Sequence, residues 1–116
     1  MESRMIPSGV DVYVALEPVS LALSFDRLAG LAEETMGRSA RSAAIFVFFN
    51  RRRTLVKALF FDGTGMCIFY KRLDRGRFQV PEPTQDKHGE LVVELSEREL
   101  DELLDGLASQ RPESIH

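Results

Sequence analysis

Two groups of basic residues lie in the middle of this 116-residue chain, and their spacing suits contact with phosphates. The groups are Arg51, Arg52, Arg53 and Lys57, and then Lys71, Arg72, Arg75 and Arg77. Basic side chains at strand ends or turns can reach phosphate oxygens, and exposed aromatic rings can stack on unpaired bases. Aromatic residues accompany both groups: Phe48, Phe49, Phe60, Phe61, Phe69, Tyr70 and Phe78. The pattern predicts a nucleic-acid-binding surface. The alternative interpretation places the rings in the core and leaves the arginines as solvated strand ends.

The nucleophilic side chains form no catalytic pattern. Cys67 is the one cysteine, and it lies in a strand-like run between Met66 and Ile68, where a thiol is typical of a small hydrophobe. His88 and His116 lie in polar segments far from it in the sequence. No CxxC or His/Cys cluster indicates a zinc site, and no Gly-rich loop leads into Lys-Ser or Lys-Thr.

A two-metal nuclease would require several converging carboxylates. Asp26, Asp62 and Asp74 could be brought together for that purpose, but nothing in their spacing indicates it, and the last two are typical turn residues. We therefore expect no enzymatic activity, no metal and no cofactor. A cryptic nuclease is kept only as a third hypothesis.

The formal net charge of −3 conceals an uneven distribution. Residues 38–77 carry ten Lys and Arg against two Asp, whereas residues 81–116 carry three Lys and Arg against ten Asp and Glu. Such asymmetry indicates an interaction surface. The acidic part includes Glu99, Glu102 and Asp105, which are candidates for docking a protein partner. The same acidic face could instead be only solvated, or could screen the basic residues from phosphate.

Hydrophobic periodicity predicts the strands that would position the basic groups. They cover 8–16, 45–49, 55–61, 66–73, 77–80 and 91–95. The continuous apolar run at 45–49 is typical of a buried central strand. The segment Asp62-Gly63-Thr64-Gly65 is a hairpin turn by composition, and short turns between three consecutive strands from 55 to 80 predict an antiparallel meander.

Two helices are predicted, over 24–36 and 96–108. Ser24 suits the N-cap of the first helix and Gly37 its C-cap. The second begins with a capping box, in which Ser96 is followed by Glu99 three residues later. These elements predict an α+β fold, an antiparallel sheet of about four to six strands with both helices on one face.

We expect one domain over residues 1–116 with a flexible tail at 110–116. The chain has no apolar run near the length of a membrane span, and its first residues lack the apolar core of a signal peptide. The sequence therefore predicts a soluble, cytoplasmic protein that does not enter a membrane.

The chain resembles the accessory proteins of insertion-sequence-66-type transposons, the TnpB or Orf2-like product of the second open reading frame. The resemblance is carried by Ile45–Phe48, Arg51-Arg52, Lys57, Leu59, Asp62-Gly63, Gly65, Lys71-Arg72-Leu73, Gly76-Arg77-Phe78 and Pro81. Shorter matches extend it over nearly the whole chain: Ile6-Pro7, Gly9-Val10, Phe25-Asp26, Leu28, Leu95-Ser96, Glu99-Leu100, Leu103-Leu104 and Gly106.

The resemblance implies a small, non-catalytic bacterial protein that assists a separate DDE transposase in moving a mobile element. It makes the basic residues a candidate surface for DNA or for the transposase. We favour direct DNA contact; the alternative is a protein-interaction module that docks on the transposase without touching DNA. Two positions depart from the family pattern. Ala22-Leu23 stands where a basic pair is usual, and Phe60-Phe61 where tryptophans are common.

Overall fold

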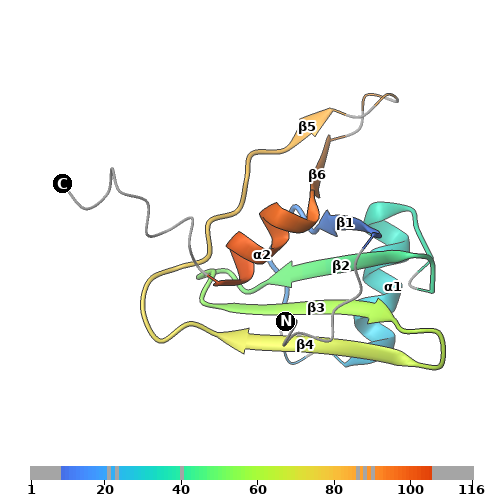
Figure 1. The fold of residues 1–116 in the computed structure, drawn as a ribbon, viewed down its shortest axis with the longest axis horizontal. Helices are drawn as coiled ribbons and strands as arrows, with labels where there is room; N and C mark the ends of the chain where they lie inside the picture. The colour runs from blue at the N-terminus through green and yellow to red at the C-terminus, as the bar shows by residue number, and fades with distance from the viewer. Residues whose placement is uncertain are drawn as a thin grey trace.

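A six-stranded sheet forms the centre of the structure (Figure 1). The computed structural model describes residues 9–20, 22, 24–39, 41–85, 87, 89 and 91–105. Its elements are β1 (Asp11–Val14), α1 (Phe25–Met36), β2 (Ala44–Phe49), β3 (Leu55–Phe61), β4 (Met66–Arg72), β5 (Thr84–Gln85), β6 (Leu91–Leu95) and α2 (Glu97–Asp105). The strands lie in the order β4-β3-β2-β1-β6-β5, so β4 is an edge strand.

The pairing confirms the predicted α+β class and its antiparallel meander. β1 and β2 are parallel and are joined through α1, while every other neighbouring pair is antiparallel. The meander runs β2–β3–β4, one strand earlier than predicted. The short strand expected at 77–80 is wrong, because the Phe78 ring is buried against Phe49, with ring centroids 5.5 Å apart. The buried ring of Phe78 directs segment 77–80 toward the core, so this segment does not pair as a strand of the sheet. A two-residue strand, β5, forms in the expected polar loop.

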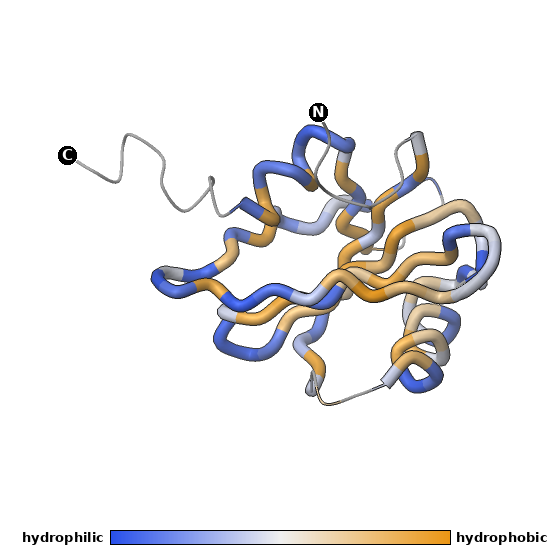
Figure 2. Tube along the Cα trace, turned by 60° about the horizontal axis from the view of Figure 1, so that its bottom comes forward, coloured by the Kyte–Doolittle hydropathy of each residue, from blue (hydrophilic) through white to orange (hydrophobic). Residues whose placement is uncertain are grey.

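The two helices pack on opposite faces of the sheet, which corrects the prediction that both lie on one face (Figure 2). On one face, Leu100, Leu103 and Leu104 of α2 join a cluster with the strands. On the other, Leu28 and Ala32 of α1 join a second cluster. The physical reason lies in β2, whose six residues are all buried. A strand that is apolar on both sides requires cover on both sides.

The helices begin and end close to the predicted residues. Gly37 terminates α1 with a left-handed φ of 67°, and its N–H donates to the Glu33 carbonyl at 3.2 Å. Ser24 has the extended N-cap backbone, but its side chain makes no capping hydrogen bond. The capping box of α2 is confirmed: the Ser96 N–H donates to Glu99 Oε1 at 2.8 Å, and the Glu99 N–H donates to Ser96 Oγ at 3.1 Å. The expected helical residues 106–108 and the expected tail at 110–116 lie outside the described residues.

The described helices include none that is both long and apolar enough to span a membrane.

Candidate nucleic-acid interface

The first basic group lies in the turn between β2 and β3, which Asn50 organises. Asn50 Oδ1 accepts hydrogen bonds from the N–H groups of Thr54 and Leu55, both at 2.9 Å, and Asn50 Nδ2 donates to Thr54 Oγ1 at 3.1 Å. Arg53 has a φ of 60°, a left-handed conformation that costs a non-glycine residue roughly 1–2 kcal/mol. These bonds hold a tight turn whose three arginines are exposed.

The second basic group lies beside this turn, although it is about twenty residues away in the sequence. The Leu73 N–H donates to the Thr54 carbonyl at 3.0 Å, and the Phe78 N–H donates to the Arg53 carbonyl at 2.7 Å. Because β3 and β4 are antiparallel, the start of β3 and the end of β4 already meet at this end of the sheet. The two backbone bonds then fasten the 73–78 loop to the 50–54 turn.

Together the two turns form what we call the arginine end of the sheet, at the left of the strands in Figure 1. Its members, all exposed, are Arg51, Arg52, Arg53, Arg72, Arg75 and Arg77. Asp74 is the carboxylate within these turns, and it is also exposed. A shallow hollow of about 470 Å³ opens beside Arg51 and Arg52 and is also lined by Ser20 and Asn50. So many cations in a small area produce a positive potential that attracts anions.

The two predicted lysines do not share one surface. Lys57 pairs in register with Tyr70 and lies on the α1 side of the sheet, with its Nζ 5.1 Å from the centroid of the Tyr70 ring. Lys71 points to the α2 side, where its Nζ donates to the Leu104 carbonyl at 2.7 Å. A cation is favourable at a helix C-terminus. Lys71 therefore helps to fasten α2 to the sheet.

The candidate docking residues on α2 are partly used within the helix. The Glu99 carboxylate closes the capping box, and Glu102 Oε2 lies 3.6 Å from the Nε of Arg98. Asp105 is exposed at the last described turn. The helix runs from the far end of the sheet, where Glu97 accepts from the Gly9 N–H, to Lys71 near the arginine end. Screening of the arginines, still a prediction, would therefore come from the last turn of α2.

The basic middle of the sequence is divided between the two ends of the sheet. Arg38 lies over the Tyr13 ring, 4.6 Å from its centroid, and Arg41 lies 5.9 Å from the centroid of Phe61. Both arginines lie in the connection between α1 and the start of β2, whereas the arginine end follows the end of β2, so they lie at the opposite end of the sheet. The arginines of residues 38–77 therefore lie on two separate surfaces.

The carboxylates considered for a nuclease do not converge. Asp62 precedes β4 and Asp74 follows it, so they lie at opposite ends of the strand. Asp62 Oδ1 accepts from the N–H groups of Thr64 and Gly65, both at 2.9 Å, and these bonds lower the pKa of the carboxyl group to about 2. Within the described residues, no group of three or more His, Cys, Asp or Glu could hold a metal ion.

Cys67 is half-buried on the α2 side and packs against the core. Burial raises the pKa of its thiol, and its hydrogen bond to Asp62 raises the pKa further. Such a thiol is a weak nucleophile at neutral pH.

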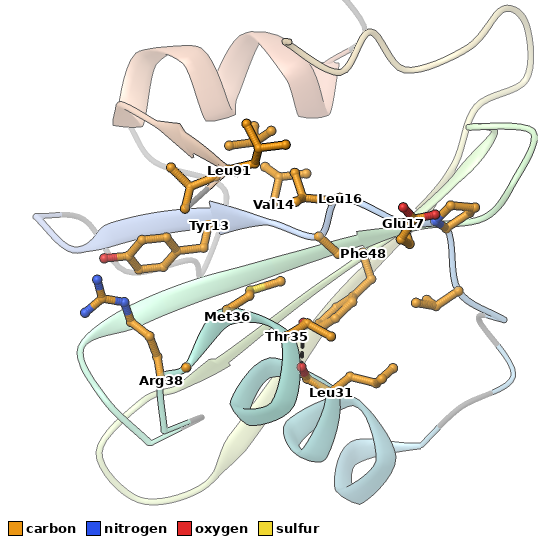
Figure 3. Close-up of a pocket in the computed structure, with 16 residues that line it drawn as sticks. Tyr13, Val14, Leu16, Glu17, Leu31, Thr35, Met36, Arg38, Phe48 and Leu91 are labelled. Atoms are coloured by element: carbon orange, nitrogen blue, oxygen red, sulfur yellow. Dashed lines mark hydrogen bonds between the residues drawn. The ribbon is translucent and has the colours of Figure 1, made fainter. Parts of the chain in front are cut away.

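An apolar groove of about 610 Å³ lies on the α1 side, between β1, the start of β6 and the end of α1 (Figure 3). Tyr13, Met36 and Phe48 line its interior, and Arg38 stands at its rim. Leu16 and Leu91 also line the groove and are 47% and 54% exposed. Periodicity in the sequence does not reveal this groove, because it exists only where α1 leaves the β1–β6 half of the sheet uncovered.

Sequence reasoning did not name Asn50, and it named Tyr70 only as one of seven aromatic residues beside the basic groups. Asn50 shapes the first turn, and the signal for it was the tendency of Asn to bond to the backbone a few residues further on. Tyr70 is the exposed member of the aromatic set. The sequence does not separate it from the buried and half-buried rings, apart from the charged residues that follow it.

The comparisons with known proteins agree with the resemblance seen in the sequence. The family described as IS66 Orf2 like protein matches residues 10–114. The chain is 33% identical over 111 residues to the uncharacterized protein y4hO of Sinorhizobium fredii, covering 94% of this chain and 92% of the relative. It is 30% identical over 78 residues to the uncharacterized protein y4jC of the same organism, covering 67% of this chain and 66% of the relative. No solved structure matches the chain.

The family match includes both basic turns, all strands of the sheet and both helices. The chain therefore belongs to the IS66 Orf2 like protein family, the accessory proteins associated with transposition of insertion sequences.

Proposed function

We propose that this accessory protein contacts DNA directly through the arginine end. The observation that carries the proposal is the pair of backbone hydrogen bonds from Leu73 and Phe78 to the 50–54 turn. These bonds convert two basic segments that are separate in sequence into one exposed surface. Arginine binds phosphate oxygens in a bidentate geometry, and backbone phosphates supply most of the affinity of a non-specific DNA contact.

The burial of side chains supports the same conclusion. Six arginines remain exposed, while Phe78, directly after Arg77, is buried. Charged side chains on a surface often do no more than interact with water. Here, however, the turn also holds Arg53 in a strained backbone conformation, and strain of this kind is common at functional sites.

The test is DNA binding as a function of salt, with two variants that remove the same charge. The first is Arg51→Ala with Arg52→Ala, at the arginine end. The matched control is Arg38→Ala with Arg41→Ala, at the opposite end. Fluorescence anisotropy with a labelled duplex, from about 50 to 200 mM salt, gives the slope of log affinity against log salt. We expect the first variant to lower that slope by about 1.8, and the control to change it little, because each lost phosphate contact contributes roughly 0.9.

Two results would contradict DNA contact. Either the wild-type protein fails to bind the duplex at about 50 mM salt, or the two double variants lose the same affinity. The second result would show that only total charge matters and that the arginine end is not a distinct site.

A second candidate function is docking on the transposase without DNA contact, and the apolar groove beside β1 favours it. Partly exposed leucines at a groove rim are typical of a protein contact. In a pull-down with the cognate transposase, this function predicts retention by Arg51→Ala with Arg52→Ala and loss by Leu16→Asp with Leu91→Asp. Full retention by the leucine variant would exclude the groove.

The acidic face of α2 is tested in the same pull-down. Glu99→Gln with Glu102→Gln removes two charges, and glutamine at position 99 can still accept the capping bond from Ser96. Loss of transposase would support docking through Glu99, Glu102 and Asp105, whereas unchanged retention would count against this face.

A further inference from the structure

Tyr70 is the one aromatic ring of the basic segments that the structure leaves exposed. Its side chain is 55% exposed. Of the other aromatic residues beside the basic groups, some are buried and the rest are half-buried. The buried ones are Phe48, Phe49, Phe60 and Phe78, and the half-buried ones are Phe61 and Phe69. The core therefore explains most of these rings but gives no reason for Tyr70 to be aromatic.

The position of Tyr70 places it beside the arginine end. Tyr70 pairs in register with Lys57, and Arg72, two residues further along β4, points to the same α1 side. The cluster beneath α1 includes Met66 and Ile68 of β4 but not Tyr70. The ring thus lies on a stretch of sheet surface that α1 does not cover, on an edge strand and next to two cations.

The contacts of the ring suit a planar, electron-poor partner that carries phosphate. Lys57 lies over one side of the ring, with its Nζ 5.1 Å from the centroid. An aromatic ring on a sheet surface, flanked by cations, is a platform on which a nucleobase stacks while its phosphates meet the charges. A base in an intact duplex is already stacked on its neighbours and is not available to such a ring.

We propose that Tyr70 stacks on an unpaired base of single-stranded DNA, whose backbone then follows Lys57 and Arg72 toward the arginine end. The inference rests on the proposed DNA contact and narrows it to strands that are single or locally open. In this arrangement the arginine end binds the phosphates, and Tyr70 distinguishes unpaired bases from paired ones.

A fluorescent variant gives a direct test, because the chain contains no tryptophan. In Tyr70→Trp, the single indole replaces the phenol ring at the proposed platform. The probes are an oligothymidylate of about ten nucleotides, an abasic oligonucleotide of the same length, and a duplex of the same length. We expect the oligothymidylate to quench the indole fluorescence, and the abasic strand and the duplex to leave it nearly unchanged. Quenching by the abasic strand to the same extent would overturn the stacking proposal.

Affinity provides the second readout. We expect Tyr70→Ala to weaken oligothymidylate binding by about 5- to 150-fold, the equivalent of the ~1–3 kcal/mol that one base–aromatic stack contributes. Tyr70→Phe keeps the ring and should retain the affinity. Phe25→Ala, which removes an aromatic ring that is 45% exposed on α1, should also retain it.

The failures of the two proposals are distinguishable. If no probe binds the wild-type protein, both the DNA contact and the stacking are wrong. If DNA binds and depends on Arg51 and Arg52 but Tyr70→Ala has no effect on the oligothymidylate, the DNA contact stands and the stacking is overturned.

Discussion

The two ends of the sheet use their charged side chains differently. At the end formed by the Asp62–Gly65 turn, Asp62 bonds to its own turn and two arginines lie over aromatic rings, Arg38 over Tyr13 and Arg41 over Phe61. At the arginine end, the turn is held by Asn50 and by backbone bonds. Among the described residues, the structure shows no hydrogen bond or ion pair made by the side chains of the six arginines at the arginine end, Arg51, Arg52, Arg53, Arg72, Arg75 and Arg77.

This difference separates charges that stabilise the fold from charges that are available to a partner. A side chain that already bonds within the protein must break that bond before it can bind a ligand. The arginine end avoids the cost because an uncharged amide and main-chain atoms hold its turns. Breaking the supports of either end, one at a time, tests whether the division is real.

The largest effect is expected from Phe78→Ala, which removes the anchor of the second basic turn. The Phe78 side chain is 1% exposed and packs against Phe49. Replacing a buried phenylalanine by alanine typically costs about 3–5 kcal/mol through lost burial and the remaining cavity. Urea unfolding measures the change in the free energy of unfolding. A loss below about 1 kcal/mol would show that the 73–78 loop is not anchored as described.

The next effect concerns Asn50, which holds the first basic turn. Asn50→Ala leaves the N–H groups of Thr54 and Leu55 without their acceptor, and we expect a loss of about 1–3 kcal/mol. Asn50→Asp keeps an acceptor oxygen at the same place and should recover most of the stability. If both variants unfold at the same urea concentration as the wild type, the amide does not organise the turn.

The two lysines of the hairpin should separate stability from binding. Lys71→Met removes the cation at the end of α2 and should cost about 1 kcal/mol of stability, with little change in DNA affinity. Lys57→Met should cost about 0.5 kcal/mol, because its contact with Tyr70 is partly exposed, but should weaken oligothymidylate binding. Methionine keeps the apolar stem in both cases. The reverse pattern, with Lys71 controlling binding, would contradict the assignment of faces.

Local signals in the sequence predict the elements well. The Asp62-Gly63 turn, the Ser96–Glu99 capping box and the apolar run at 45–49 each contain their cause within a few residues. The side of the sheet on which each helix packs has no such local signal. It depends on which strand is apolar on both faces and on which other elements cover that strand. The missing strand at 77–80 has the same origin, since the buried ring of Phe78 outweighs the strand propensity of its neighbours.

The candidate site was predicted in its composition but not in its geometry. Both basic groups are visible in the sequence, yet the bond between the Phe78 N–H and the Arg53 carbonyl joins residues 25 positions apart and has no local signature. Strand alternation alone places Lys57 and Lys71 on opposite faces once the hairpin register is known. Alternation does not reveal that α2 ends over the face of the sheet that carries Lys71. There the lysine donates a hydrogen bond to the last turn of α2 and stabilises the fold.

The smallest effect is expected at the far end, where a charge is used within its own turn. The folded-state pKa of Asp62 is about 2, below its ordinary value of 3.8, because the N–H groups of Thr64 and Gly65 stabilise the carboxylate. A lowered pKa means that this stabilisation is fully present above the ordinary value and is lost as the pH falls through about 2. Asp62→Asn keeps an oxygen acceptor without the charge. The difference in Tm between wild type and variant should therefore shrink between pH 4 and pH 2, since the other carboxyl groups titrate equally in both proteins. A difference that stays constant over this range would show that the charge of Asp62 does not hold the turn, and would remove one of the contrasts between the two ends of the sheet.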